Sequence, residues 1–254
     1  MDSDNISNCF MMTLDVVVVN INHELNFGEL QDMLPLSTPR ARMSRMGESK
    51  PYHHGNLREV LLQSALRLIA EVGPTAFTLR EVARQAGVSH NAPYRHFQDK
   101  DALLAAVATQ GYGELTEAML EAAGQQPKGL DRLKQAGLAY VSFALRRPEH
   151  FAVMFDAPFS KQTHPEAADA AERAFSVLVS LVEECQQKRQ LTPGSPLDLA
   201  LLAWSMVHGI AKLAITGRLP HRSKAEILKF AAFVIDESLP AKRRRGVLPQ
   251  PAHT

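Results

Sequence analysis

Apolar residues recur at intervals of three and four positions along most of the chain after residue 56, the spacing of an amphipathic helix. The first run begins at Leu57 and ends at Gly73-Pro74, a dipeptide that terminates helices. Because no strand-like alternation of useful length occurs after residue 20, the pattern predicts an all-α architecture of about nine helices. Later runs cover 79–86, 89–97, 130–144, 148–155, 167–191, 197–215 and 224–239, and another starts at Asp99-Lys100.

The first 50 residues do not follow this pattern. Residues 1–38 contain six acidic residues and no Lys or Arg, whereas 39–51 contain three arginines and one lysine against one glutamate. A single strand-like run at 14–19 has no partner run to satisfy its backbone, so we expect residues 1–50 to form a poorly ordered extension. Met43 and Met46 precede the first helix, and the extension is therefore either a start-codon artefact or a natural flexible arm.

Residues 78–97 show the spacing of a helix-turn-helix, two short helices joined by a tight turn. Thr78 and Glu81, three residues apart, form a capping-box sequence at the start of the first helix. Gly87 can adopt the left-handed conformation that ends this helix. An ordinary helical hairpin is the alternative interpretation. The seam between the two helices is expected to contain Val82, Ala83, Ala86 and Val88.

The second helix of this motif is expected to start with Ser89 or Asn91 as its N-cap. Pro93 then lies in the first turn, where its missing N–H is tolerated. The outward side chains of this helix can donate hydrogen bonds, and no acidic residue occurs between Glu81 and Asp99, which favours a DNA-contacting helix over a structural one. These outward residues are His90, Asn91, Tyr94, Arg95 and His96.

The stretch from Thr78 to Gly87, followed by Val88-Ser-His-Asn-Ala-Pro-Tyr-Arg-His-Phe-Gln-Asp-Lys100, resembles the DNA-binding domain of the tetracycline-repressor (TetR) family. The resemblance covers about residues 54–105. It implies an all-helical homodimer whose N-terminal domain binds a palindromic double-stranded DNA operator. It also implies that a larger C-terminal domain, at 106–240, binds a small-molecule effector that releases the DNA. The basic run at 242–245 separately indicates a flexible tail at 241–254.

Two further comparisons with the family concern single positions. This chain has Asn91 and Pro93 where family members often have Gly and then Leu or Ile before the tyrosine, at the start of the recognition helix. Trp204, His208 and Gly209 are similar to a signature in the C-terminal domain of one TetR subgroup.

The chemistry of the motif suggests which residues contact which part of the DNA. Hydroxyl, imidazole and ammonium groups at helix starts can hold phosphates without reading bases. We assign this role to Thr78, Tyr94, His96 and Lys100. Positions facing the major groove would read bases, because Asn pairs with adenine and Arg with guanine. This second group contains His90, Asn91, Ala92 and Arg95, and Ser89 is added as a DNA-binding residue at the helix start.

The last two predicted helices are apolar around most of their circumference, and a helix that is apolar all round must be buried all round. Both cannot be central in a chain of this size, so we expect a four-helix interface between two subunits. A thick monomer core is the alternative. The predicted interface residues are Leu199, Leu202, Met206, Ile227, Phe230, Phe233 and Val234.

Aromatic residues and methionines in the C-terminal half are candidates for an effector pocket, although residues at this spacing also form ordinary cores. A mostly apolar cavity with a few polar groups would suit a lipophilic effector. The candidates are Tyr140, Phe143, Phe151, Met154, Phe155, Phe175, Trp204 and His208.

Composition narrows the function classes. With 45% hydrophobic and 22% charged residues the chain is of globular type, and its net charge of +1 gives no general sign of a nucleic-acid partner. The DNA-binding prediction therefore depends on the local motif. Cys9 and Cys185 stand far apart, so neither a disulfide framework nor a Cys-based zinc site is expected, and no metal or cofactor is predicted.

Enzymatic and membrane functions are disfavoured. The chain has no glycine-rich phosphate loop, and Cys185 and His208 are the only nucleophile and base types on neighbouring buried helices. A helical ligand-binding protein without operator function, or an enzyme on a helical scaffold, remains the alternative. The apolar run 199–215 falls short of a bilayer span, so we expect a buried helix and no membrane partner. The expected location is the bacterial cytoplasm, in association with the nucleoid.

Overall fold

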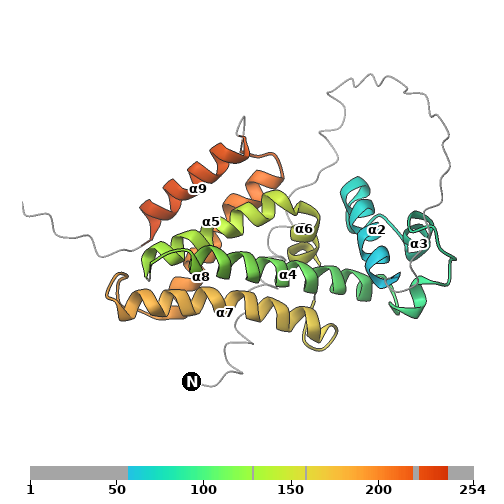
Figure 1. The fold of residues 1–254 in the computed structure, drawn as a ribbon, viewed down its shortest axis with the longest axis horizontal. Coiled ribbons are helices and arrows are strands. Elements are labelled where there is room, and N and C mark those ends of the chain that lie inside the picture. Colours follow the sequence, from blue (N-terminus) through green and yellow to red (C-terminus); the bar gives the residue numbers. More distant parts are fainter. Residues whose placement is uncertain (1–56, 128, 158, 220–222, 240–254) are drawn as a thin grey trace, which may run out of the picture.

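A computed structural model describes residues 57–127, 129–157, 159–219 and 223–239 (Figure 1). The N-terminal extension, its strand-like run and the basic tail predicted above lie outside these residues. The described part contains α-helices, one short 3-10 helix and no strand, which confirms the all-α prediction. The elements are α2 (Leu57–Val72), α3 (Leu79–Gln85), η3 (Pro93–Arg95), α4 (Lys100–Gly124), α5 (Leu130–Arg146), α6 (Pro148–Asp156), α7 (Pro165–Gln187), α8 (Pro196–Ile215) and α9 (Lys224–Ser238).

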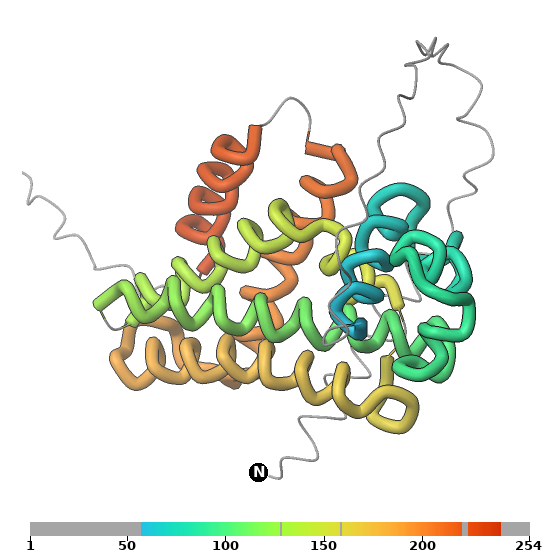
Figure 2. The backbone as a smooth tube through the Cα atoms, turned by 45° about the vertical axis from the view of Figure 1, so that its right-hand side comes forward, coloured from blue at the N-terminus to red at the C-terminus, as the bar shows by residue number. Residues whose placement is uncertain are grey.

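The helices form a small unit at one end of the molecule and a larger bundle beside it. Helices α2 and α3 with η3 make the small unit, and the first part of α4 contacts α2. The rest of α4 runs along α5 and α7, and α5 also packs against α6, α8 and α9. Figure 2 shows α4 and α7 side by side, with α9 on the far side of α5. Helix α4 therefore belongs to both parts.

Local signals in the sequence fix where these helices begin. Asp99 caps α4 by accepting a hydrogen bond of 2.8 Å from the backbone N–H of Ala102. Ser223 and Glu226 form a capping box at the start of α9. Three other helices, α6, α7 and α8, have Pro in their first turn, where the absent N–H has no partner to lose.

A glycine sets the distance between α4 and α6. A Cβ atom at Gly111 would lie only 2.6 Å from Sδ of Met154 and 3.2 Å from Cβ of His150. The absence of a side chain at Gly111 therefore lets the two helices approach closely, so that α6 closes the bundle next to α2.

Helix α8 is longer than the apolar run predicted from the sequence. By length and composition it could cross a membrane, but core helices of soluble proteins pass the same test. It packs against α5, α7 and α9, and its buried face contains Trp204 and Val207. The packing agrees with the prediction of a core helix, while part of its circumference remains uncovered in the single subunit.

Candidate DNA-binding surface and ligand pocket

The capping box predicted at the start of α3 is present. The backbone N–H of Thr78 donates to Oε2 of Glu81 at 2.8 Å, and the backbone N–H of Glu81 donates to Oγ1 of Thr78 at 3.3 Å. The Thr78 hydroxyl also donates to the carboxylate at 2.9 Å. These hydrogen bonds from Thr78 lower the pKa of Glu81, which keeps the carboxylate ionised. The start of the helix-turn-helix is therefore fixed by local chemistry.

The turn after α3 is a Schellman motif. Gly87 has a φ of +69°, the left-handed conformation that glycine adopts without strain. The backbone N–H of Val88 donates to the carbonyl of Ala83 at 3.0 Å, and that of Gly87 donates to the carbonyl of Arg84 at 3.1 Å. This is the termination that the sequence predicted.

The second helix of the motif is shorter than predicted. The expected helix from Ser89 or Asn91 to Phe97 is a turn followed by the 3-10 helix η3, whose N-cap is Ala92 with no side-chain cap bond. The N–H of Ala92 donates to the carbonyl of Ser89, and the N–H of His96 donates to Pro93, both at 2.9 Å. These i to i+3 bonds are those of a 3-10 helix, and the N–H of Phe97 also donates to the carbonyl of Pro93 at 2.9 Å, an i to i+4 bond that ends the segment.

The predicted DNA-contact residues differ in exposure: one is buried and most of the others are exposed. Ala92 is only 8% exposed, so its assignment to the major groove is wrong as a side-chain contact: its methyl group packs inward beside Pro93. The other predicted side chains that were expected outside are exposed, although the Thr78 hydroxyl also takes part in the capping box with Glu81. The exposed members of the predicted set are Thr78, Ser89, His90, Asn91, Tyr94, Arg95 and His96.

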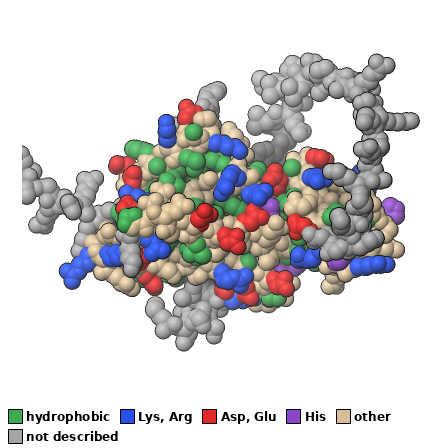
Figure 3. Space-filling model, in the orientation of Figure 1, with side chains coloured by type: hydrophobic (Ala, Val, Ile, Leu, Met, Phe, Trp, Pro, Cys, Tyr) green, Lys and Arg blue, Asp and Glu red, His purple; other side chains and the backbone are tan. Residues whose placement is uncertain are grey.

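An open groove lies between α3 and the segment around η3. Its walls contain Arg80 and Arg84, which stand four residues apart on the exposed side of α3, and neither was among the predicted DNA contacts. An i, i+4 pair of arginines on the polar face of the first helix was the signal that could have identified them. In Figure 3, basic and histidine side chains lie at this end of the molecule. The groove is lined by Arg80, Glu81, Arg84, His90, Asn91 and Tyr94.

Lys100 has an intramolecular role in addition to its predicted contact with phosphate. Its Nζ donates to the backbone carbonyl of Thr75 at 2.7 Å and lies 4.4 Å from the centre of the Phe77 ring. Partial burial lowers the pKa of Lys100. Lys100 therefore joins the start of α4 to the loop between α2 and α3, and its contact with DNA stays a prediction.

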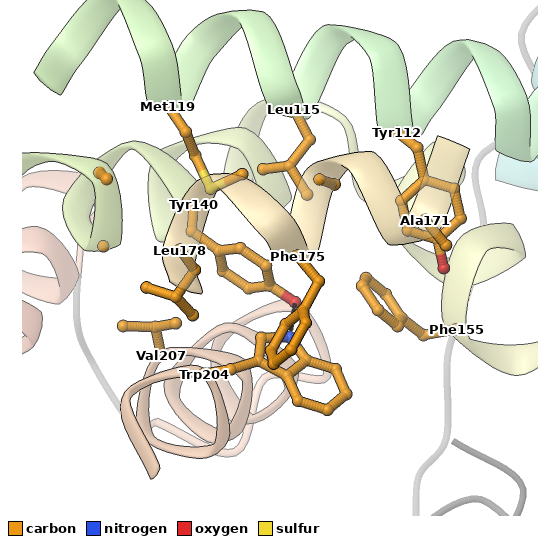
Figure 4. Close-up of a pocket in the computed structure, with 13 residues that line it drawn as sticks. Tyr112, Leu115, Met119, Tyr140, Phe155, Ala171, Phe175, Leu178, Trp204 and Val207 are labelled. Carbon is orange, nitrogen blue, oxygen red and sulfur yellow. Dashed lines mark hydrogen bonds between the residues drawn. The ribbon is translucent and has the colours of Figure 1, made fainter. Parts of the chain in front are cut away.

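A cavity opens inside the helical bundle, about midway along α4. Its empty volume is about 480 Å³, open space at the mouth included. Five helices contribute to the lining, among them α7 with two alanines that leave room between the larger side chains (Figure 4). The lining residues are Tyr112, Leu115, Met119, Ala136, Gly137, Tyr140, Phe155, Ala171, Ala174, Phe175, Leu178, Trp204 and Val207.

A chain of hydrogen bonds lies at one wall of this pocket. The indole Nε1–H of Trp204 donates to the hydroxyl oxygen of Tyr140 at 3.2 Å, and that hydroxyl lies 2.9 Å from Nδ1 of His208. Burial lowers the pKa of His208 to about 4, so its ring is neutral at pH 7 and can accept the Tyr140 proton. On another wall the hydroxyl of Tyr112 donates to the carbonyl of Met154 at 2.7 Å. Burial raises the pKa of both tyrosines.

Comparison with known proteins identifies both parts of the fold. The protein-family model described as "Bacterial regulatory proteins, tetR family" matches residues 61–107, which contain the helix-turn-helix. The model described as "Tetracyclin repressor-like, C-terminal domain" matches residues 133–237, which contain most of the pocket. The chain belongs to the TetR family.

Individual relatives agree with this assignment. The TetR-family chain is 23% identical over 201 residues to the uncharacterized HTH-type transcriptional regulator YerO of Bacillus subtilis, covering 76% of this chain and 68% of YerO. A solved protein with unknown function from Rhodococcus sp. RHA1 is 35% identical with a TM-score of 0.66, covering 76% of this chain and all of that one.

A bacterial regulatory protein in the TetR family from Rhodococcus RHA1 shares the fold at 20% identity, with a TM-score of 0.61 over 72% of this chain and 95% of that one. Family and fold together make this chain a DNA-binding transcriptional regulator.

The structure supports only part of the pocket predicted for this TetR-family protein. Tyr140, Phe155, Phe175 and Trp204 line the cavity, and binding of an effector there stays a prediction. Four predicted residues do not line it. Phe143, Phe151 and Met154 are at most 3% exposed and fill the core behind the wall, because helical spacing marks buried positions whether or not a cavity adjoins them.

The fourth residue, His208, stands behind the lining, where it bonds to the Tyr140 hydroxyl and its ring packs against Phe155 and Trp204. The wall formed by α4 was not among the predicted pocket residues. Tyr112, Leu115 and Met119 recur there at intervals of three and four, a signal that was present but indistinguishable from an ordinary core face.

The residues predicted for the subunit interface also differ in how exposed they are in the single subunit. Ile227 is only 6% exposed and belongs to the core of the single subunit, so its assignment to the interface is wrong. Phe233 is 61% exposed and Leu202 is 45% exposed, an unusual position for large apolar side chains. Leu213, which was not predicted, is 44% exposed. The remaining predicted residues are half-buried: Leu199, Met206, Phe230 and Val234.

Within the described ranges, no group of three or more His, Cys, Asp or Glu side chains is arranged to hold a metal ion. Cys185 is a buried free thiol whose pKa burial raises to about 11, far from the lowered value that a nucleophilic thiol needs. YerO, reported above, carries the name of a transcriptional regulator.

Proposed function

We propose that this regulator is a dimeric repressor that leaves a palindromic operator when a small lipophilic molecule enters the pocket. The observation that carries the proposal is the course of α4. The helix begins at Lys100 beside the helix-turn-helix, and its middle supplies Tyr112, Leu115 and Met119 to the pocket wall. Lys100 and Met119 are separated by roughly 29 Å of continuous helix. A ligand that shifts this wall must therefore also shift a support of the DNA-binding unit.

The exposed residues around η3 form the proposed DNA surface. Tyr94, His96 and Thr78 would hold phosphates, whereas Asn91 and Arg95 would reach base edges. We add Arg80 and Arg84 as phosphate contacts, because both line the groove next to these residues and a guanidinium binds phosphate well. His90 and Ser89 complete the exposed set, and Lys100 would contribute an ammonium group at the start of α4.

Dimerisation would follow from an apolar surface on α8 and α9. Leu202, Met206 and Leu213 follow one side of α8 at helical spacing, and Phe230 and Phe233 lie on α9, which packs against α8. Figure 3 shows apolar side chains at the surface beside α9. Association of two such surfaces would bury them in a four-helix interface. Two-fold symmetry would also double the DNA contacts, which one short helix-turn-helix needs for selective binding. We call Leu199, Leu202, Met206, Leu213, Phe230, Phe233 and Val234 the α8–α9 face.

A repressor acts where chromosomal DNA is, so the proposal places the protein in the bacterial cytoplasm with the nucleoid as its partner. Membrane association forms no part of it, because α8 packs against three other helices and we assign its uncovered apolar side to the subunit interface.

Selection of bound DNA from a random pool tests this function most directly. The expected product is a palindrome whose half-sites are one helical turn apart or a multiple of it. A mobility-shift titration against the DNA upstream of the protein's own gene should show the same preference at about 0.1 M salt. Arg95→Ala should change the selected bases, whereas Arg84→Ala should weaken binding to all DNA sequences by the same factor. Binding without any sequence preference would contradict the proposal.

A further inference from the structure

Among the residues that the structure describes, none that lines the pocket carries a charge with which to balance a charged ligand. No Asp, Glu, Lys or Arg is among the residues that line it, and its polar atoms come from Tyr112, Tyr140 and Trp204. Asp156 and Lys212, near His208, form an ion pair with each other. An ionised ligand would exchange its hydration for apolar walls without a counter-ion, which is strongly unfavourable. The lining therefore selects uncharged molecules.

The hydrogen-bond donors of the pocket are already committed inside the protein. The hydroxyl of Tyr112 donates to the carbonyl of Met154. The Trp204 indole, which can only donate, is bound to the oxygen of Tyr140. The hydroxyl of Tyr140 donates its proton to Nδ1 of His208, whose ring is neutral. With this arrangement each buried donor is satisfied, and the Tyr140 oxygen keeps the capacity to accept one more hydrogen bond.

The walls around this acceptor are aromatic. The rings of Phe175 and Trp204 meet edge to face, with centroids 6.2 Å apart, and Phe155 lies 6.3 Å from Trp204. In Figure 4 the hydroxyl of Tyr140 points toward the indole between these side chains. A planar ring system placed here would contact aromatic faces and edges while its polar group reached Tyr140.

We infer that the pocket takes an uncharged, flat and largely apolar molecule that donates one hydrogen bond to the oxygen of Tyr140, as an aryl amine or a phenol does. The inference rests on the proposed function, because it names the chemical class of the effector at the same site. It distinguishes this class from carboxylates, cations and ligands whose only polar group is an acceptor.

Two dyes with one skeleton test the charge requirement. N-phenylnaphthylamine is uncharged and carries one N–H, whereas anilinonaphthalene sulfonate adds a negative charge to the same rings. Trp204 is the single tryptophan of the chain, so energy transfer from it to a bound dye reports occupation of this pocket. We expect energy transfer with the uncharged dye and binding at least about 10-fold weaker for the sulfonate. Equal or tighter binding of the sulfonate would overturn the inference.

The donor requirement is tested by methylating the nitrogen of the uncharged dye. The methylated dye should bind roughly 2- to 10-fold more weakly, the effect of one hydrogen bond. Tyr140→Phe should reduce this difference to nothing, while Tyr112→Phe, which removes the other hydroxyl from the wall, should preserve it. If Tyr112→Phe abolished the difference and Tyr140→Phe did not, the assigned acceptor would be wrong. If Tyr140→Phe did not fold, the two dyes on the natural protein would still decide the donor requirement.

Release of DNA is measured separately, so that the two proposals can fail independently. Dye binding with these preferences that left the selected DNA bound would contradict the effector role of the pocket and leave the ligand class standing. Release by the sulfonate alone would overturn the ligand class and leave the regulator function standing. Ala174→Phe, which fills the cavity from α7, should abolish energy transfer in either case, and persistent transfer would place the dye elsewhere.

Discussion

Replacing Phe233 with Asp tests the α8–α9 face with little risk to the single subunit. Phe233 is 61% exposed, so a carboxylate at this position stays in water when the subunit is alone. Surface substitutions of this kind change the free energy of unfolding by about 0.5 kcal/mol or less. A loss of dimer in the variant would therefore report the interface rather than unfolding.

The size of the effect follows from the exposed area. A phenylalanine side chain of roughly 200 Å² that is 61% exposed leaves about 120 Å² for a partner to cover. Two symmetric copies give about 240 Å², which at ~25 cal/mol per Å² corresponds to at most about 6 kcal/mol. With partial burial taken into account, the dissociation constant of the dimer should rise by roughly 100- to 10,000-fold. An unpaired carboxylate in the interface adds to this loss.

Light scattering and sedimentation should show about half the mass for Phe233→Asp at micromolar concentration, and operator affinity should collapse although α3 and η3 are unchanged. Leu120→Asp is the matched control, because Leu120 is 51% exposed but lies on α4. This control should remain dimeric and bind DNA normally. A Phe233→Asp variant that stayed dimeric down to nanomolar concentration would refute the interface, and one that unfolded would place Phe233 in a structural role.

Three other predictions concern the DNA-binding unit and the pocket. Gly87→Ala should lower the free energy of unfolding by about 1 kcal/mol in denaturant titrations, because the residue has a φ of +69° while its surroundings leave room for a Cβ. Lys100→Ala and Arg84→Ala should each reduce the salt slope of DNA binding by about one without altering base preference. Only the Lys100 variant should also lower the melting temperature, because it loses the bond to Thr75; a changed base preference would contradict the phosphate role. The pKa of His208 is lowered from 6.5 to about 4, so the unfolded chain binds the extra proton first and stability should fall by about 2–3 kcal/mol as pH decreases from 6.5 to 4. His208→Gln should flatten this part of the pH profile in urea titrations, and an unchanged profile would assign the acid sensitivity to other groups.

The parts of the fold that the sequence predicted well depend on local chemistry. Thr78, Glu81 and Gly87 determine where α3 begins and ends through bonds to neighbouring residues, so three positions in the sequence were sufficient. The helix after Gly87 was predicted too long because Ser89 and Asn91 are good capping residues. Despite that capping tendency, the segment that forms is a short 3-10 helix that starts at Pro93.

The pocket and the interface depend on relations between distant residues, which periodicity does not contain. Phe143 and Phe155 have the same apolar character in the sequence, yet only Phe155 borders the cavity. Similarly, Ile227 and Phe233 both belong to the apolar pattern of α9, but α9 turns Ile227 toward the core and leaves Phe233 outside. Helical spacing shows that a residue is apolar on a helix face, whereas the neighbouring helices decide what covers it.

The two alanines that α7 contributes to the pocket bear on how such regulators diverge. Helix α5 packs against five other helices, so a change there disturbs the whole bundle. Ala171 and Ala174 instead border the cavity from α7, which packs against α4, α5 and α8. Natural selection can enlarge or shrink these side chains one carbon at a time while the operator surface stays the same. Regulators of this kind can therefore change the effector they respond to while they continue to control the same genes.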